Sequence, residues 1–445
     1  MILEEGKFQF LGFFDFLSII IWFFILTNKI NSDFQRNKDT SFFRFYKTGF
    51  YVKFISAIIF SIVYILIYEG GDSTAYWDSA QKLNNLFFSS PSKFFSEFFS
   101  LDPNRLRFLT FDLDTGLPPN WIYKEDEAWF AAKIFSLLTF ITFKSYFAMT
   151  MISSYISFRV SWLLYELVLK YHLFSEKTAA IGILFLPSTC FWCTGITKDM
   201  IVYSCVIYVF IQLFTFLNPL QLKSYRNIVF GFVALFLILY VRDFMLICAF
   251  GPFFMALGAR LSRKQKSNFS KWVIQLIFIG FVLFLMTFFL SSEKGQEFAA
   301  EAEIIQKDLK TNPTYGENRY DLGITDFSIN GMFSAMPISI YTAFYRPYIW
   351  EADSIFIQIS ALEALFFMLI SFLFFMTRNL FTSLSDIRNN ELLMASLVFA
   401  LILGFFAGYT SGLFGVLVRF KAPLLPFLFL VLMYKDQKKV SELDF

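Results

Sequence analysis

The stretch that decides the fold is residues 187–199, Pro-Ser-Thr-Cys-Phe-Trp-Cys-Thr-Gly-Ile-Thr-Lys-Asp, together with the runs that flank it. Thr178–Leu186 precedes it and Met200–Leu217 follows it, and both runs have the apolar composition of membrane-embedded helices. A proline, a glycine and the charged pair Lys198-Asp199 interrupt this apolar sequence. A charge at the centre of a bilayer costs about 2.5–3.5 kcal/mol on insertion scales, so an ionisable pair near the membrane is a candidate functional site.

The composition of the whole chain is that of a membrane protein. Hydrophobic residues make up 57% of the 445 residues, charged residues make up 16%, and 66 residues are Phe. Soluble domains contain about 45–50% apolar and about 25% charged residues. The sequence therefore predicts an all-α, polytopic integral membrane protein surrounded by membrane lipids. Its net charge of +3 is too small to favour a nucleic-acid partner.

Cysteine and histidine give little support to a metal or cofactor site. Cys190 and Cys193 have the spacing of a redox motif, but no thioredoxin-like βαβ pattern surrounds them. His172 is the only His in the chain, and a zinc site needs a cluster of ligands. We therefore expect no metal and no cofactor.

Eleven apolar stretches predict membrane spans, since a spanning helix needs about 20 apolar residues and fewer where the bilayer is thin. They lie near residues 10–27, 49–68, 146–169, 178–191, 199–217, 227–241, 244–258, 272–290, 354–376, 391–409 and 414–434. No internal repeat or linker divides the chain, so we expect a single transmembrane domain over residues 1–445. Two excursions, 69–145 and 291–353, leave the membrane.

Lys and Arg determine the predicted orientation, because positively charged loops stay in the cytoplasm. These residues are concentrated in loops 28–48, 259–271 and 377–390 and in the C-terminal tail. The pattern places the N-terminus outside and the C-terminus in the cytoplasm, which requires an odd number of spans. Both excursions and the 187–199 segment are then expected on the outer face.

The requirement for an odd number of spans also decides how Ala128–Phe143 is interpreted. This stretch is apolar but short, and it contains Lys133. A span there would move a positively charged loop to the outside, so we predict a re-entrant or interfacial helix on the outer side. The alternative is that the apolar runs 227–241 and 244–258 form one bent helix.

Asp72 and Asp78 lie in the first outer segment, directly after a predicted span. One interpretation is structural, in which Asp72 or Ser73 caps the helix that follows. The other is catalytic, in which a carboxylate at the mouth of a cavity takes a proton from a sugar hydroxyl. A carboxylate in this place suits both roles.

Lys198, Asp199 and Arg242 also have two interpretations. Asp199 is favourable at a helix N-terminus, so the pair Lys198-Asp199 can be a capped helix start with a local ion pair. Alternatively, Lys198 binds a phosphate with the help of backbone N–H groups. Arg242 lies between two short apolar runs and is a candidate for lining the same cavity.

The segment Arg346–Glu351, Arg-Pro-Tyr-Ile-Trp-Glu, precedes another predicted span. The planar guanidinium of Arg346 suits bidentate contact with a phosphate. Trp350 offers a flat ring for a sugar. In the structural alternative, Arg346 and Glu351 pair with each other and the aromatic residues form an interfacial belt.

Arg419 and Lys421 lie in a segment that contains two prolines. Two cations near a predicted helix start oppose the helix dipole, and an anionic ligand would explain them. The structural alternative is an ion pair with one of the outer-face carboxylates, Asp72, Asp78, Asp199 or Asp243.

Three short motifs carry a resemblance to known proteins. They are Pro-Ser-x-x-Phe-Trp-x-x-Gly-Ile-x-Lys-Asp at 187–199, Arg-Pro-Tyr-x-Trp-Glu at 346–351 and Gly-x-x-x-Arg-x-Lys-x-Pro at 415–423. Together with the general topology, they resemble patterns in bacterial multispanning proteins that are similar to polysaccharide (O-antigen type) polymerases and to membrane glycosyltransferases of the GT-C class. The resemblance covers these motifs and not the whole chain.

The resemblance implies a lipid-linked glycan substrate on a polyprenyl (pyro)phosphate and a place in the bacterial cytoplasmic membrane. GT-C enzymes typically place an acidic residue in their first large outer loop, which here implies Asp72 or Asp78. The departure is that this loop follows the second predicted span and not the first. Lys198, Arg346 and Arg419 would then neutralise the leaving phosphate.

Two other functional classes stay open. A lipid or glycan flippase would more often have repeat symmetry between two halves. A non-enzymatic membrane subunit of an envelope or secretion complex would dock a protein partner through the outer loops, above all 291–353.

Overall fold

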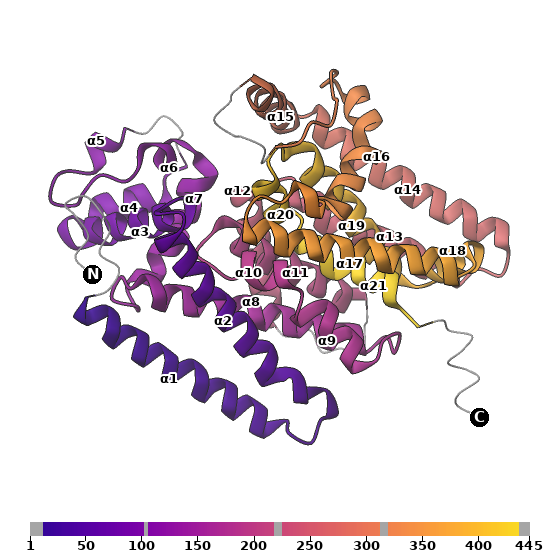
Figure 1. The fold of residues 1–445 in the computed structure, drawn as a ribbon, viewed down its shortest axis with the longest axis horizontal. Helices are drawn as coiled ribbons and strands as arrows, with labels where there is room; N and C mark the ends of the chain where they lie inside the picture. The colour runs from indigo at the N-terminus through magenta and orange to yellow at the C-terminus, as the bar shows by residue number, and fades with distance from the viewer. Residues whose placement is uncertain (1–11, 102–105, 218–224, 312–318, 436–445) are drawn as a thin grey trace. The chain divides into compact units, whose positions relative to one another are not determined.

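The computed structural model describes residues 12–101, 106–217, 225–311 and 319–435, and most of these residues are helical (Figure 1). No strand occurs among them. The predicted all-α class is confirmed for this part of the chain.

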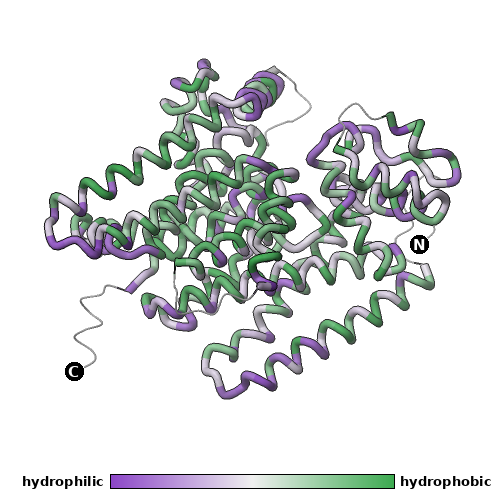
Figure 2. The backbone as a smooth tube through the Cα atoms, turned by 180° about the vertical axis from the view of Figure 1, so that it is seen from behind, coloured by the Kyte–Doolittle hydropathy of each residue, from purple (hydrophilic) through white to green (hydrophobic). Residues whose placement is uncertain are grey.

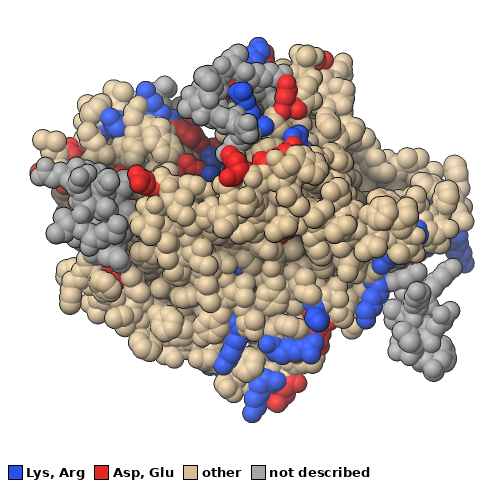
Figure 3. Space-filling view, viewed as in Figure 1, with Lys and Arg blue, Asp and Glu red and all other residues tan. Residues whose placement is uncertain are grey.

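Eight helices are long and apolar enough to cross a membrane, as in a multi-pass membrane protein. They span Phe13–Arg36, Ser41–Leu66, Lys198–Leu217, Met245–Arg263, Asn268–Ser291, Ile355–Thr377, Glu391–Thr410 and Phe414–Met433, and each overlaps a predicted span. The first of them, α1 (Phe13–Arg36), has many exposed apolar side chains. In Figure 3 its flank carries few charges, and charged side chains gather at its connection to α2 (Tyr46–Leu66).

The predicted count of about eleven spans is not confirmed, because the other predicted spans form more polar or shorter helices. α8 (Tyr146–Leu169) is long enough, but it is not among the eight and carries several hydroxyl side chains. The stretch 178–191 is divided, since α9 (Glu176–Leu184) ends before Pro187, which has no N–H to continue it. α12 (Tyr225–Val241) is apolar but has 17 residues. That these helices cross the membrane stays a prediction.

The helices form two compact units. Unit 1 comprises residues 1–162, 190–205 and 236–243, and unit 2 comprises residues 163–189, 206–235 and 244–445. This division into units does not test whether the chain is a single transmembrane domain, which stays a prediction.

Unit 1 contains the predicted excursion 69–145, which is mostly helical. α3 (Asp72–Ser89) and α7 (Asp126–Thr139) pack side by side (Figure 1). The shorter helices of this excursion are α4 (Pro91–Phe99), α5 (Arg107–Thr110) and α6 (Asn120–Lys124), and η1 (Ser41–Phe45) joins α1 to α2. α7 coincides with most of the helix predicted at 128–143, and its re-entrant or interfacial position stays a prediction.

Unit 2 is built around α19 (Glu391–Thr410), against which α13 (Met245–Arg263), α16 (Ile329–Tyr345) and α21 (Leu425–Met433) pack. α14 (Asn268–Ser291) packs on α13 and is hydrophobic along most of its length, with hydrophilic residues at the turn between them (Figure 2). The remaining elements are α15 (Glu293–Thr311), η3 (Ile349–Glu351), α17 (Ile355–Thr377), α18 (Leu380–Asn389), α20 (Phe414–Phe420) and η4 (Ala422–Leu424).

α16 is an apolar helix that the sequence did not predict within excursion 291–353. Pro337 lies inside it, and a proline inside a run of residues normally argues against a helix. The helix packs closely on α19 at Gly408, where a Cβ would collide with the backbone carbonyl oxygen of Ser339. Close packing on α19 therefore stabilises a helix that its local sequence disfavours.

Candidate functional sites

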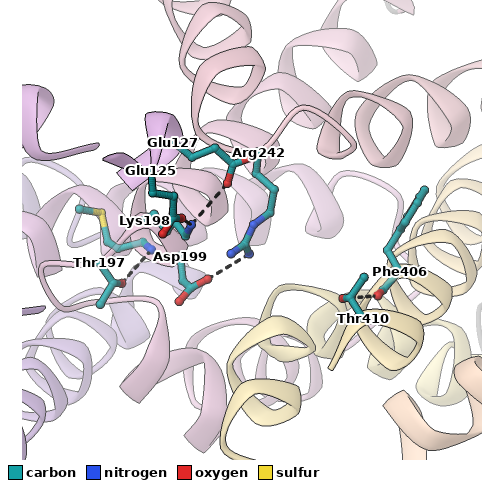
Figure 4. Close-up of polar contacts among 9 residues, drawn as sticks. Glu125, Glu127, Thr197, Lys198, Asp199, Arg242, Phe406 and Thr410 are labelled. Carbon is teal, nitrogen blue, oxygen red and sulfur yellow. Dashed lines mark hydrogen bonds and ion pairs between the residues drawn. The ribbon is translucent and has the colours of Figure 1, made fainter. Parts of the chain in front are cut away.

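An ion-pair cluster lies in unit 1 at the start of α11 (Lys198–Leu217) (Figure 4). Its members are Glu125, Glu127, Lys198, Asp199 and Arg242. Lys198 and Asp199 form the first turn of α11, Glu125 and Glu127 lie at the start of α7, and Arg242 directly follows α12. The cluster brings together three residues that the sequence predicted and two that it did not.

Lys198 is held between two carboxylates that are accessible to solvent. Its Nζ forms a close ion pair with Glu125 and lies 3.4 Å from Oε2 of Glu127. The side chains of Glu125 and Glu127 are 47% and 45% exposed, against 16% for Lys198. A cation in the first turn of a helix opposes the helix dipole, so the two carboxylates supply the negative charge that Lys198 needs. Because they are exposed, they can move away and leave Lys198 to another anion.

Asp199 and Arg242 form a buried pair beside it. Nη1 of Arg242 donates to Oδ1 of Asp199 at 3.1 Å, and the two side chains are 6% and 3% exposed. Asp199 is favourable at the N-terminus of α11. Lys198 and Asp199 thus each pair with a residue distant in the sequence, and the Asp199–Arg242 pair fixes the start of α11.

The backbone before α11 is closely packed. A Cβ at Gly195 would collide with the ring of Phe60 in α2, so this approach requires glycine. Oγ1 of Thr197 accepts the backbone N–H of Met200 at 3.3 Å and satisfies one of the free amides of the helix start. These contacts position Lys198 for the pairs just described.

Asp72 and Asp78 both lie on α3, but in different surroundings. Asp72 is in the first turn and partly exposed. Asp78 is buried, and its Oδ1 lies 2.7 Å from Nζ of Lys82 one turn further on. The predicted cap is wrong, because Gly71, at a φ of +104°, is the N-cap in place of Asp72 or Ser73. Asp72 is therefore the more accessible of the two predicted bases.

The second candidate site lies in unit 2 and is centred on Arg346. Its Nε lies 3.1 and 3.2 Å from the two carboxylate oxygens of Glu351, so these residues pair as the structural alternative predicted. The guanidinium also lies 5.0 Å and 5.3 Å from the ring centroids of Tyr320 and Phe414. Burial raises the pKa of Tyr320, so the phenol stays neutral beside the guanidinium. Arg346 is thus already engaged on several sides.

An aromatic surface adjoins Arg346. Trp350 is 81% exposed, and its ring stacks on Tyr348 with centroids 4.9 Å apart. The hydroxyl groups of Tyr348 and Tyr341 are 2.8 Å apart. Burial and this hydrogen bond raise the pKa of Tyr348 to about 12, so its phenol is protonated at neutral pH. A flat exposed ring such as Trp350 suits the face of a sugar or the membrane interface.

Arg419 is not at a helix start, contrary to the prediction. α20 ends at Phe420, so Arg419 lies in its last turn, where a cation complements the helix dipole. Lys421 lies between two helical elements, as the C-cap of α20 and the N-cap of η4. The dipole therefore no longer argues for an anionic ligand at Arg419. Lys421 is buried, donates from Nζ to the carbonyl oxygen of Arg346 at 2.6 Å, and interacts electrostatically with Glu363.

Sequence reasoning missed the carboxylates that complete these sites. Glu125 and Glu127 belong to an acidic run just before the apolar stretch 128–143. Glu363 lies in the middle of a predicted span, is buried, and accepts the backbone N–H of Ser188 at 3.3 Å. An acidic residue within an apolar span is itself a signal of a paired or functional charge, and it points to Glu363.

The predicted site residues are divided between the two units. Unit 1 holds Asp72, Asp78, Lys198, Asp199 and Arg242, and unit 2 holds Arg346, Trp350, Glu351, Arg419 and Lys421. That they form one site stays a prediction. Within the part of the chain that the structure describes, no group of three or more His, Cys, Asp or Glu side chains is arranged to hold a metal ion.

No protein-family model, curated protein or solved structure matches the chain.

Proposed function

We propose that the chain is a membrane glycosyltransferase or polysaccharide polymerase at the outer face of the bacterial cytoplasmic membrane. Its donor is a glycan on a polyprenyl (pyro)phosphate, and its acceptor is a sugar hydroxyl. The observation that carries the proposal is the ion-pair cluster. Two cations and three carboxylates gather at one helix start in a chain with only 16% charged residues.

Lys198 is suited to a phosphate because its present partners are exchangeable. The N-terminus of α11 adds the backbone N–H groups of its first turn and the positive end of the helix dipole. Phosphate oxygens can replace Glu125 and Glu127 on Nζ without uncovering a buried charge. Arg242 stays with Asp199 and keeps the helix start in place.

The chemistry of glycosyl transfer needs both kinds of charge found in the cluster. A bond forms between the acceptor oxygen and the anomeric carbon of the donor, and the bond from that carbon to the phosphate oxygen breaks. Lys198 stabilises the negative charge that develops on the leaving (pyro)phosphate. The acceptor proton passes to a carboxylate, for which Glu125 and Glu127 are available once Lys198 has exchanged them. Asp72 or Asp78 is the base that the family resemblance implies, and Asp72 is the more accessible of the two.

Arg346 has a different role in this proposal. Glu351 and two aromatic rings already hold its guanidinium, so a phosphate would have to displace a well-formed ion pair. We assign Arg346 to positioning of the exposed aromatic surface, on which Trp350 contacts a sugar face.

The test is extension of polyprenyl-linked glycans by the purified full-length chain in proteoliposomes. Loss of one group that stabilises transition-state charge lowers rates by about 10²–10³-fold, so we expect that loss in Lys198→Ala. The double variant Glu125→Gln/Glu127→Gln should also lose extension. The matched control is Lys294→Ala, which removes an exposed ion pair of 2.9 Å with Glu297 and should leave extension unchanged.

Full extension by Lys198→Ala would refute the proposal. Transfer of the lipid-linked glycan across the bilayer without extension would favour the flippase instead.

A further inference from the structure

Lys53 is a basic side chain in the interior of unit 1 that neither candidate site uses. It lies in the middle of α2 and is fully buried. Its Nζ donates to Oγ of Ser157 in α8 at 3.2 Å and lies 5.0 Å from the ring centroid of Tyr203 in α11. Among the described residues, no ion pair includes Lys53. An ionisable side chain at such a place in a candidate span is a functional-site hypothesis.

The groups around Lys53 do not fix the protonation state of its amine. An ammonium group has three N–H donors, and Ser157 accepts one hydrogen bond. Among the residues that the structure describes, the titratable groups that face Lys53 are Tyr203 from α11 and the thiols of Cys190 and Cys193, which lie in and just after α10 (Pro187–Trp192). None of these groups is a carboxylate. The amine can therefore gain or lose a proton without breaking an ion pair.

A row of buried hydroxyl groups leads from Lys53 toward α3. On α8 these groups share one face at spacings of three or four residues, and they belong to Tyr146, Thr150, Ser153 and Ser157. Oγ of Ser61 in α2 donates to Oγ1 of Thr150 at 3.1 Å. The hydroxyl groups of Tyr146 and Ser73 in α3 are 2.8 Å apart. Three helices of unit 1 thus contribute to one polar row in an otherwise apolar interior.

Ser153 gives a second, independent observation. Its Oγ is buried and has no hydrogen-bond partner among the described residues, although it lies between Thr150 and Ser157 on the row. Its neighbour Ser154 instead donates back to the carbonyl oxygen of Met151 at 2.8 Å. A buried hydroxyl without a partner is unfavourable unless water or a passing proton carrier binds it. The hydroxyl group of Ser153 can therefore bind a water molecule or a proton carrier at the centre of the row.

The row reaches a partly exposed residue at the α3 end, because Ser73 follows Asp72 at the start of α3. Hydroxyl groups also lie on the other side of Lys53. There the hydroxyl of Tyr203 and Oγ of Ser161, one turn beyond Ser157 on α8, are 2.7 Å apart, and both residues are buried. We therefore expect exchange with water from the α3 end.

We propose that this row is a proton path that opens at the start of α3 and that Lys53 is its proton-binding residue. A hydroxyl group accepts a proton from one neighbour and donates its own to the next, so only O–H and N–H bonds form and break. A proton from the aqueous phase at the α3 end converts the Lys53 amine into an ammonium group, and release reverses the step. This function does not depend on glycosyl transfer.

The test is 13C NMR of the full-length chain in lipid nanodiscs, with lysine labelled at Cε. The resonance that is absent from Lys53→Met belongs to Lys53, and Lys53→Arg provides the same assignment if the first variant does not fold. We expect this resonance to titrate reversibly while circular dichroism shows the fold intact. A resonance that does not move over the pH range of the folded protein would overturn the proposal.

The path is tested by the rate of proton exchange at Lys53. Ser61→Ala and Ser153→Ala remove hydroxyl groups from the row, and each should slow exchange at least tenfold. Ser154→Ala is the matched control, since that hydroxyl is bound to its own helix, and it should leave the rate unchanged. Equal rates in all three variants would show that Lys53 exchanges by another route and would overturn the path.

Discussion

Lys198 and Asp199 are adjacent in the sequence, but loss of their pairs should affect stability very differently. Arg242→Ala removes the guanidinium 3.1 Å from the buried Asp199. Breaking a buried pair costs about 3–5 kcal/mol, because the other charge is left uncompensated. Lys198→Ala breaks pairs with carboxylates that are 47% and 45% exposed, and exposed pairs contribute about 0–1 kcal/mol. The two variants should therefore differ by at least about 2 kcal/mol in free energy of unfolding, which is roughly 30-fold in the unfolding equilibrium constant.

The assay is reversible unfolding of the purified chain from lipid–detergent micelles by SDS, followed by Trp fluorescence. Lys294→Ala is the control, because its ion pair with Glu297 is exposed on α15 and should contribute little. The double variant Asp199→Leu/Arg242→Leu should recover most of the loss, since apolar groups can replace a buried pair with little change in stability. Recovery would assign the loss in Arg242→Ala to the uncompensated charge of Asp199.

Equal destabilisation by Lys198→Ala and Arg242→Ala would refute the distinction between an exchangeable and a structural pair. A loss below about 1 kcal/mol in Arg242→Ala would refute it as well, because that is the range of exposed pairs. Glycan extension measured on the same preparations separates stability from activity. We expect Lys198→Ala to be stable and inactive.

Two further predictions concern packing and pH. Gly408→Ala should destabilise unit 2 by about 1–3 kcal/mol, because the added Cβ would collide with the carbonyl oxygen of Ser339. Gly280→Ala is the control. A Cβ there would have nothing within 4 Å, so this variant should be neutral or slightly stabilising in the same SDS titration. The backbone N–H of Thr115 donates to Oδ1 of Asp112 at 2.9 Å and lowers the pKa of that carboxyl. Its contribution is present above the unfolded pKa of about 3.9 and is lost as pH falls through the folded pKa, so Asp112→Asn should lower stability at pH 6 and match the wild type at about pH 2. A constant difference across this pH range would contradict the assignment.

Hydrophobic length predicted most of the long helices, because the need for a long apolar run is local information. It failed where tertiary packing outweighs the local pattern. α16 contains Pro337 and was not predicted, yet it packs closely on α19. The run 178–191 was predicted as one span, and Pro187 divides it. Both errors concern prolines whose effect depends on their position within a helix.

The candidate sites were predictable only in part, since the sequence identifies charged residues but not distant partners. Arg346 and Glu351 are five residues apart, and their pairing was among the predicted alternatives. Lys198 meets Glu125 at a separation of 73 residues, which no local pattern indicates. Arg419 was misjudged for a different reason. The sequence did not show where α20 ends, and the sign of the dipole argument depends on that end.

The partner of a cation is therefore a better guide to its function than its own burial. Lys421 is held by a backbone carbonyl oxygen and Arg242 by a buried carboxylate, so a ligand could reach either one only by leaving a buried polar group unpaired. The Lys198 side chain is itself only 16% exposed, yet the carboxylates of Glu125 and Glu127 that pair with it can turn into solvent at little cost. Lys53 has no carboxylate partner within the described part of the chain, and a proton is a ligand small enough to reach it through a row of hydroxyl groups. This criterion supports the proposals that Lys198 binds an anionic substrate and that Lys53 binds a proton.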